Sequence, residues 1–382
     1  WMGRFVDLQI IGNRCYYRFS GCSNEEFMTT IEFKSWEFRS WEYGLERKYF
    51  SFIYRNTPTE KILWSYIGFS PILIRYLQSI GYLINGKELF RAKSIDIGHM
   101  KYRLYDYQQD ATNAWINSGC CGVIKICTSG GKTICACDII SRMKTRTIIL
   151  VHTSDLLLNT WFNVLVEQFG ESIKSRIGII GGALSKKDRQ HMGIECNISY
   201  EANMSKDIVV ATAQSLLNKL DKVYNDRFGL MIWDECHHVS AEQFNKVASA
   251  IRSPFRCGLT ATILRPDGTT PLIYGMMGDI VYRITIRELV KKKVLVEPTF
   301  NEIIINDTLI QNEISLCGLT KLELSRFVKQ KSASSIVKMN YILKLAKSLS
   351  LNNKKFIMYT DYVGTKNKEI KFTKINYTAY LF

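Results

Sequence analysis

The chain has 382 residues, of which 46% are hydrophobic, so we expect two or three domains with substantial cores. It contains no run of about 18 consecutive apolar residues, which excludes a membrane-spanning helix and argues against a membrane partner. The formal net charge of +16 favours a polyanionic partner, with nucleic acid first, although a lysine-rich composition alone would give the same excess.

Residues 1–98 are rich in aromatic side chains and are predicted to form a small α+β accessory module. Residues Tyr49–Tyr54 are typical of a strand, and residues 70–84 are predicted to form a helix with Ser70 as its N-cap and Pro71 as its first residue. Two interpretations of this module stay open. It could bind branched or duplex DNA, or it could serve folding and protein contacts.

Residues 99–290 alternate between apolar β-favouring runs and helical stretches. This alternation predicts a parallel sheet covered by helices on both faces. In such folds ligands bind at the carboxyl ends of the strands, and the polar clusters of this region follow the strands there. The predicted strands lie within residues 121–127, 146–152, 175–182, 207–212, 230–235 and 256–262.

Residues 291–382 begin a second α/β unit in this interpretation. A helix is predicted over residues 334–349 and a strand over residues 354–360. The remaining residues are too few for a complete domain, so we expect this unit to be truncated.

The loop after the first predicted strand of the 99–290 region suits a polyphosphate. Its glycines let the backbone curl around an anion, and the next helix, predicted to begin near Lys132, presents its positive end. Lys132 would reach the β- and γ-phosphates, and Thr133 would bind Mg²⁺. Because Ile126 replaces the usual first glycine of this pattern, a plain strand–turn–helix junction is the alternative. The loop consists of Thr128, Ser129, Gly130, Gly131, Lys132 and Thr133.

A second polar cluster follows the predicted strand that ends at Asp234 and Glu235. Phosphoryl transfer needs a carboxylate that holds Mg²⁺, a role that suits Asp234, and a group that polarises the attacking water, a role that suits Glu235. His237 is predicted to connect the nucleotide site to neighbouring loops. The eleven cysteines are scattered without a Cys-x-x-Cys pair, which predicts reduced thiols, a cytoplasmic location and no zinc site.

The order of several motifs resembles the superfamily 2 helicases and translocases with an Asp-Glu-x-His box, and within them the phage UvsW-like repair helicases, with XPB and RecG more distant. Residues 41–83 loosely resemble the small N-terminal module of the UvsW-like group. The similar motor segments are residues 104–111 on the adenine side, 127–133 as motif I, 151–161 and 178–182 as motifs Ia and Ib, 211–216, 234–238 as motif II and 258–268 as motif III.

This resemblance implies a RecA-like motor lobe over residues 99–290, the start of a second RecA-like lobe over residues 291–382, and ATP with Mg²⁺ as cofactors. Lys132, Asp234 and Glu235 would be catalytic, and Thr133 and Asp234 would hold the metal ion. Gln108, with Tyr107 or Tyr105, would contact the adenine, and core packing is the alternative for the two tyrosines.

The resemblance also implies contacts with nucleic-acid phosphates by Thr153, Ser154, Gly182, Thr212 and Gln214. Ordinary loop capping by hydroxyl side chains is the alternative. Thr260 and Thr262 would couple the nucleotide state to the nucleic-acid surface, with plain strand-end hydrogen bonding as the alternative.

The implied function is an ATP-dependent DNA helicase or translocase in recombination, repair or replication, of phage or viral origin and acting in the host cytoplasm. DNA is the expected partner ahead of RNA. Two departures matter. Ile263 stands where the family usually has proline, and the later Gln-x-x-Gly-Arg-x-x-Arg motif has no match, so slow ATP hydrolysis is expected. The alternatives are an ATPase subunit of a restriction or nuclease system and a passive nucleic-acid-binding protein with an incomplete motor.

Overall fold

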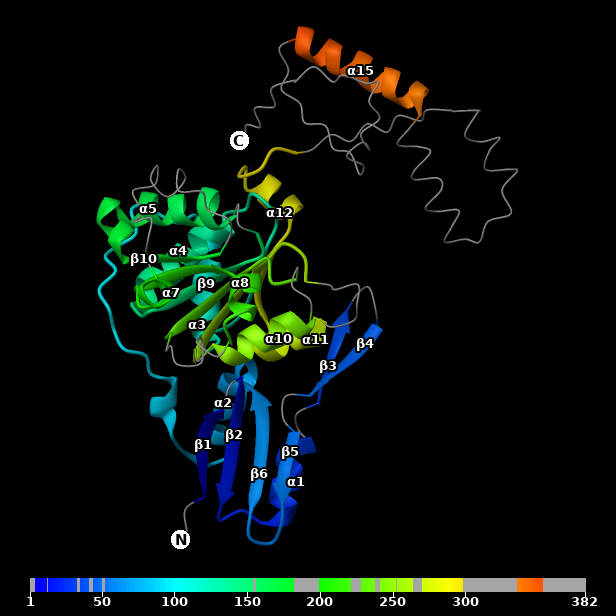
Figure 1. Cartoon of the computed structure of the whole chain (residues 1–382). Helices are drawn as coiled ribbons and strands as arrows, with labels where there is room; N and C mark the ends of the chain where they lie inside the picture. Colours follow the sequence, from blue (N-terminus) through cyan, green and yellow to red (C-terminus); the bar gives the residue numbers. More distant parts are fainter. Residues whose placement is uncertain are drawn as a thin grey trace. The chain divides into compact units, whose positions relative to one another are not determined.

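The structure is a computed structural model that describes residues 4–11, 13–32, 35–40, 44–49, 52–153, 156–181, 199–220, 228–237, 241–251, 253–263, 270–297 and 335–352 (Figure 1). The chain divides into two compact units, residues 1–297 and 298–382. In the second unit the described element is helix α15 (Ile336–Leu351), which confirms the helix predicted over residues 334–349. The strand predicted over residues 354–360 lies outside the described residues.

The first unit begins with a five-stranded sheet in the order β5-β6-β2-β1-β7, in which only β1 and β7 pair in parallel. Helices α1 (Asn24–Glu32) and α2 (Ser70–Ser79) cover one face, where Phe27 and Leu77 share a core with Tyr17 and Leu63. The strands are β1 (Phe5–Ile11), β2 (Arg14–Ser20), β5 (Phe52–Asn56), β6 (Lys61–Tyr66) and β7 (Leu83–Asn85), and β3 (Ser35–Ser40) with β4 (Gly44–Tyr49) forms a separate antiparallel pair.

Helix α2 differs from its prediction at both ends. Phe69 is the N-cap, so Ser70 is already helical, and the helix ends at Ser79. Gly81, with a φ of +93°, turns the chain, and the residues after it join the sheet as β7 beside β1. The helical prediction for residues 83–84 is therefore wrong, because a helix pattern of apolar residues does not distinguish the last turn from a short strand that covers the same core.

The predicted strand over residues 49–54 also differs from the structure. Strand β4 ends at Tyr49 and β5 begins at Phe52, so one continuous run of β-favouring residues contributes to two strands. These strands belong to different sheets. A composition that favours strands therefore marked the right region and missed the break.

The second sheet of this unit has seven strands in the order β10-β11-β9-β12-β13-β8-β14, and every neighbouring pair is parallel. The predicted runs coincide with strands β8 to β13, whereas the edge strand β14 was not predicted. The bounds are β8 (Cys121–Ile126), β9 (Thr147–Val151), β10 (Ile177–Ile180), β11 (Ile208–Thr212), β12 (Leu230–Asp234), β13 (Phe255–Thr260) and β14 (Ile280–Ile284).

Two cores lie on the two faces of this parallel sheet. Leu230 and Ile232 of β12 pack in one core, and Met231 and Trp233 pack in the other. The first core includes residues of α3 (Asp106–Asn117), α4 (Lys132–Met143), α5 (Asn163–Phe169), η4 (Glu171–Arg176) and α12 (Ile286–Lys291), and the second includes residues of α7 (Tyr200–Met204), α8 (Ala213–Leu217), α10 (Ala241–Ala250) and α11 (Thr270–Met277). The predicted fold class, a RecA-like parallel sheet flanked by helices beside a small α+β module, is confirmed.

The two sheets of the first unit are joined by close backbone packing. A Cβ at Gly68, in the short 3₁₀ helix η1 (Ile67–Phe69), would lie 2.3 Å from the backbone nitrogen of Gly278. A Cβ at Gly275 would lie 2.7 Å from the ring of Tyr66. Arg75 donates hydrogen bonds to the carbonyl oxygens of Asn117 and Ser118 at the end of α3. The boundaries predicted at residues 98/99 and 290/291 stay predictions.

Among the described residues, no helix combines the length and the apolar composition that crossing a membrane requires. Nor do three or more His, Cys, Asp or Glu side chains gather among them in a way that would hold a metal ion.

Candidate nucleotide site

The loop between β8 and α4 requires its two glycines. A Cβ at Gly130 would lie 2.4 Å from Cγ2 of Ile126, and one at Gly131 would lie 2.2 Å from Nε2 of Gln108. Gly131 is also the N-cap of α4, with a φ of +79°. The loop thus comes close to its neighbours where side chains would obstruct it, and the N–H groups of the first turn of α4 face the loop. Thr128 and Ser129 lie exposed in the loop, and Thr133 lies half-buried in that first turn.

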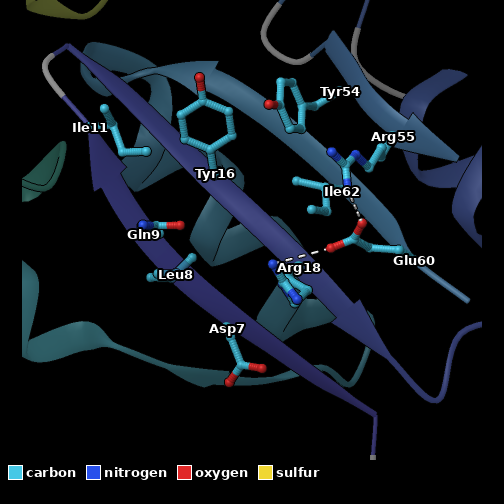
Figure 2. Close-up of a pocket in the computed structure, with 10 residues that line it drawn as sticks. All are labelled: Asp7, Leu8, Gln9, Ile11, Tyr16, Arg18, Tyr54, Arg55, Glu60 and Ile62. Atoms are coloured by element: carbon cyan, nitrogen blue, oxygen red, sulfur yellow. Dashed lines mark hydrogen bonds and ion pairs between the residues drawn. The ribbon is translucent and has the colours of Figure 1, made fainter.

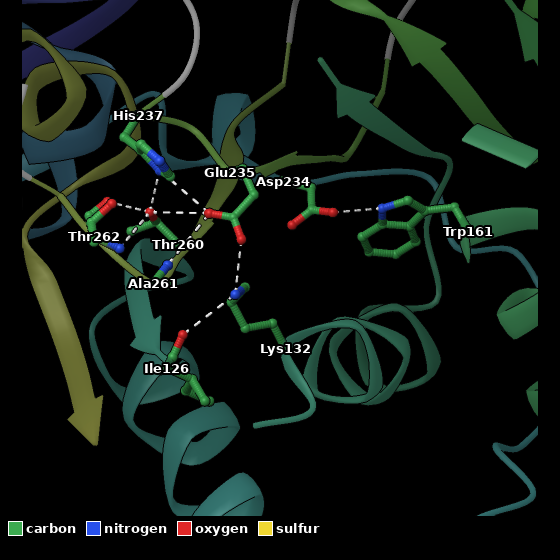
Figure 3. Close-up of polar contacts among 9 residues, drawn as sticks. All are labelled: Ile126, Lys132, Trp161, Asp234, Glu235, His237, Thr260, Ala261 and Thr262. Atoms are coloured by element: carbon green, nitrogen blue, oxygen red, sulfur yellow. Dashed lines mark hydrogen bonds and ion pairs between the residues drawn. The ribbon is translucent and has the colours of Figure 1, made fainter. Parts of the chain in front are cut away.

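Lys132 begins α4 and points toward the end of β12 (Figure 3). Its Nζ lies 2.9 Å from Oε1 of Glu235, and it donates a hydrogen bond of 3.4 Å to the carbonyl oxygen of Ile126. Strands β8 and β12 are both part of the parallel sheet, so their carboxyl ends lie at the same edge. The structure therefore brings together the two clusters that the sequence separates by about a hundred residues.

Asp234 is the last residue of β12 and is only 6% exposed. Its Oδ2 accepts a hydrogen bond of 2.9 Å from Nε1 of Trp161, which lies in the π-helix η3 (Leu156–Phe162) and is fully buried. Burial raises the pKa of the Asp234 carboxyl, and the hydrogen bond from Trp161 opposes that rise. The sequence motifs did not assign Trp161 a role. A tryptophan that follows a polar strand end was the available signal.

Glu235 follows β12 with a φ of +47°, a left-handed conformation that costs a non-glycine residue about 1–2 kcal/mol. Burial alone would raise the pKa of its carboxyl. The hydrogen bond and charge of Lys132, together with His237, outweigh burial and hold the pKa below its ordinary value. The carboxylate is thus ionised and aimed at Lys132 by a backbone conformation that the surroundings must maintain.

His237 connects the acid pair to the end of β13. Its Nδ1 lies 2.6 Å from Oγ1 of Thr260 and 3.3 Å from Oε2 of Glu235. The same carboxylate oxygen accepts a hydrogen bond of 3.4 Å from the backbone N–H of Ala261, and Thr260 Oγ1 also contacts the carbonyl oxygen of Thr262 (Figure 3). One carboxylate therefore contacts both the lysine of the loop and the strand end predicted to couple the sites.

The adenine-side candidates lie directly against this loop. The hydroxyl of Tyr107 donates a hydrogen bond of 3.0 Å to the carbonyl oxygen of Gly130, while its ring is only 2% exposed. Gln108 Oε1 accepts from the backbone N–H of Tyr105 at 3.0 Å. The ring of Tyr105 stacks on Tyr107 at 5.9 Å and is 62% exposed, so it presents the accessible aromatic face.

The candidates for nucleic-acid contact follow strands β9 and β11 at the same edge. Thr153 accepts a hydrogen bond of 3.4 Å from the backbone N–H of Leu156. Thr212 is 5% exposed and caps α8 by accepting from the N–H of Ser215, which is the capping alternative. Gln214 is exposed on α8. Ser154 and Gly182 lie outside the described residues, so their predicted contacts, like those of the others, stay predictions.

The residues present fit ATP and Mg²⁺. The two glycines let the loop pack tightly against Ile126 and Gln108, a lysine and the N-terminus of α4 supply positive charge, and a buried carboxylate with a threonine hydroxyl offers the kind of oxygen ligand that Mg²⁺ prefers. The pairing of Lys132 with Glu235 offsets the charge of both groups.

The fold is that of a RecA-like lobe, a parallel sheet flanked by helices, and the chain is similar in sequence to known helicases and translocases. Residues 101–265 match the family model described as "Type III restriction enzyme, res subunit". The chain is 35% identical over 192 residues to the DNA 3'-5' translocase XPB2 of Sulfurisphaera tokodaii, which covers 50% of this chain and 38% of that protein. The recognition of the superfamily from the motifs is confirmed.

Two further similarities extend the comparison. The helicase/translocase subunit XPB of general transcription and DNA repair factor IIH from Enterocytozoon bieneusi is 25% identical over 254 residues, which cover 59% of this chain and 39% of that protein. The crystal structure of the UvsW helicase from bacteriophage T4 matches with 16% identity and a TM-score of 0.46, over 73% of this chain and 99% of that chain. The chain thus spans between a third and two fifths of the length of these two XPB relatives.

Proposed function

We propose that this chain is the motor part of a nucleic-acid-dependent ATPase that translocates along DNA or unwinds it. The observation that carries the proposal is the contact of Lys132 with Glu235, at 2.9 Å, beside the buried Asp234. Lys132 would bind the phosphates, and Glu235 would orient and deprotonate the attacking water. Mg²⁺, held by Thr133 and Asp234, would neutralise negative charge on the phosphates.

The contacts of Glu235 support a link between nucleotide binding and the loop after β13. A phosphate that draws Lys132 away from Glu235 leaves that carboxylate to its other partners, among them Ala261 and His237. Their positions relative to Thr260 would then depend on the nucleotide. This link is the role that we propose for Thr260 and Thr262.

DNA is the partner that we propose, and three observations support it. The net charge of +16 favours a polyanion, and the names of two relatives, a DNA translocase and a DNA repair factor subunit, describe action on DNA. The likeness to XPB in a repair factor supports a role in DNA repair or recombination. A phage or viral origin and action in the host cytoplasm stay proposals of the motif resemblance.

An ATPase assay with and without DNA tests the proposal. We expect DNA to raise the turnover of the wild-type chain and Lys132→Ala to abolish both basal and stimulated turnover, because the lysine contacts the phosphates. Lys174→Ala is the matched control, since Lys174 also pairs with a glutamate, Glu171, at 2.6 Å but lies away from the loop. Turnover that DNA does not raise, or that survives Lys132→Ala, would refute the motor function.

A second candidate is the ATPase subunit of a restriction system, which the description of the matching family model favours. It is distinguished by incubating the chain with supercoiled plasmid DNA, Mg²⁺ and ATP. ATP-dependent linearisation would support the restriction candidate, whereas DNA-stimulated ATPase activity that leaves the plasmid intact supports the translocase.

A further inference from the structure

The five-stranded sheet has one face that the helices do not cover. Along β1 and β2 every second residue is buried in the core below α1 and α2, and the residues between them point the other way. On this outer face Gln9, Tyr16 and Trp64 form one row across β1, β2 and β6, according to the strand register. Arg14 and Tyr66 are opposite each other in the adjoining row.

Aromatic rings and arginines alternate on this outer face. Tyr16 and Tyr54 meet edge to face with ring centroids 5.2 Å apart, and Trp64 meets Tyr66 at the same distance. The guanidinium of Arg14 lies 4.3 Å above the Trp64 ring. Tyr54 is 55% exposed. These contacts hold the rings in defined orientations while leaving ring surface accessible, which lowers the entropy lost when a planar ligand stacks on them.

A groove of about 640 Å³ runs along this face between Tyr16 and Tyr54 at one end and Arg18 with Glu60 at the other (Figure 2). Glu60 accepts from both Arg18, at 3.2 Å, and Arg55, at 2.6 Å. The remaining carboxylate, Asp7, accepts a hydrogen bond of 2.8 Å from Asn85. In the lining of the groove Arg18 and Arg55 balance Asp7 and Glu60, and Arg14, which lies over Trp64 beside the groove, adds a further positive charge to this face.

We propose that this outer face, defined by Gln9, Arg14, Tyr16, Arg18, Tyr54 and Trp64, binds single-stranded DNA. Bases stack on Tyr16 and Tyr54, and the arginines contact the phosphates. Every base has a flat π surface, so aromatic rings beside positive charge bind a strand without reading its sequence. A duplex keeps its bases stacked inside and offers no such surface. This proposal rests on the proposed DNA function of the motor.

The arrangement of polar groups fits a nucleotide better than a peptide. Gln9 lies beside Tyr16 and carries both a donor and an acceptor for the edge of a stacked base. An extended peptide binds most simply at the unpaired edge of a sheet, whereas these side chains lie on its face. Tyr66, at one end of the face, packs against Gly275 of the motor lobe, so the face is continuous with the part of the chain that would move along DNA.

The test measures fluorescence anisotropy of the full chain, without nucleotide, with a labelled oligodeoxythymidylate of about 20 nucleotides, which is longer than a typical single-strand site. Tyr16→Leu keeps an apolar contact and removes the stacking surface. We expect it to weaken binding by about fivefold to a hundredfold, the range for loss of one stacked base. An abasic oligonucleotide of the same length should bind weakly to the wild type and should not respond to the substitution.

Tyr102→Leu is the matched control. Tyr102 is 43% exposed and has Lys101 Nζ 5.5 Å from its ring centroid, so it has the same chemistry at a place outside the outer face. Its substitution should leave oligonucleotide binding unchanged. Tyr54→Leu, at a more exposed position, replaces Tyr16→Leu if that variant does not fold, as judged by its thermal transition.

Three results would overturn the proposal. The first is that Tyr16→Leu and Tyr54→Leu both bind the oligodeoxythymidylate as tightly as the wild type. The second is that the substitutions weaken the binding of a duplex as much as that of the single strand. The third is that the wild type binds the abasic strand as tightly as the thymidine strand. A uridine oligonucleotide bound much more tightly than the thymidine one would overturn the assignment to DNA. The ATPase assay separates the two proposals. If DNA stimulates turnover but the tyrosine substitutions do not change strand binding, the outer-face proposal is wrong and the motor proposal stands.

Discussion

The two sheets of the first unit offer ligands different parts of their structure. The parallel sheet is covered on both faces, so its polar residues gather at one edge, where Lys132 contacts Glu235 beside the buried Asp234. The mixed sheet of the module is covered on one face, so its polar and aromatic residues spread over the other. The edge of the parallel sheet suits chemistry that needs charged groups shielded from water and in contact with one another. The open face of the module suits contact with a long polymer that does not depend on its sequence.

This difference predicts how substitutions behave. At the edge each group depends on its neighbours, so one change should remove most of the activity. On the outer face the contacts are exposed and separate, so each substitution should weaken binding only in part and leave the fold intact. The following predictions probe this contrast, beginning with the largest expected effect.

Glu235→Gln is expected to lower ATP turnover by about 10²–10⁴-fold while ATP binding persists, because the amide cannot take a proton from water. Steady-state turnover and equilibrium binding of a fluorescent ATP analogue measure the two quantities. Glu171→Gln, which breaks the remote pair with Lys174, should change neither. Turnover within tenfold of the wild type would mean that Glu235 is only a structural partner of Lys132.

Gly131→Ala is expected to weaken ATP binding by about tenfold or more, since its Cβ would lie 2.2 Å from Nε2 of Gln108. Gly81→Ala is the control, because Gly81 also has a positive φ, +93°, but has nothing within 4 Å of its Cβ. Both variants should lose stability from left-handed strain of about 1–2 kcal/mol. Equal ATP affinity in the two variants would contradict the close fit of the loop.

Trp161→Phe is expected to raise the Mg²⁺ concentration required for turnover by about tenfold, the lower range for loss of a partner that orients a metal ligand. The Trp161 N–H lowers the pKa of Asp234, so its removal raises that pKa. The carboxylate then ionises only at higher pH, and the acidic limb of the turnover profile should move to higher pH.

Trp115→Phe is the control for this change. Trp115 is equally buried, and its Nε1 donates at 3.0 Å to the carbonyl oxygen of Arg256, away from the site. A comparable loss of stability without a change in the pH profile is expected. Identical profiles for the two variants would make Trp161 a packing residue alone.

Arg55→Gln is expected to have the smallest effect, with no measurable change in the thermal transition. Its ion pair with Glu60 is exposed, and exposed pairs contribute little to stability. Differential scanning calorimetry measures the transition. A clear drop in Tm would show that the outer face holds the sheet together, and so would weaken the contrast between face and edge.

Much of the motor lobe could be predicted because its strands are buried on both faces and appear as continuous apolar runs. Parallel strands end at one edge, so the sequence pattern placed Lys132 and Glu235 at the same edge of the sheet. The bond from Trp161 to Asp234 could not be predicted, since it depends on the π-helical geometry of residues 156–162. Strand β14 was not predicted from the sequence, because it is an edge strand whose residues are mostly only partly buried and whose pairing is irregular.

The module was harder to predict for the same physical reason. Its strands are half-buried, and apolar residues on one face of a short segment do not specify a helix or a strand, as residues 83–85 illustrate. The outer face was visible in the sequence only as a high aromatic content. Which rings share a face became clear from the register of β1, β2 and β6.

The backbone contact between Gly68 and Gly278 has a mechanical consequence. Because not even a methyl group fits between these two backbone segments, the module packs directly against the motor lobe at this point. If the outer face binds a strand, any movement of the motor lobe would carry that strand with it. The small sheet would then move as an extension of the motor lobe and not as a separately linked domain.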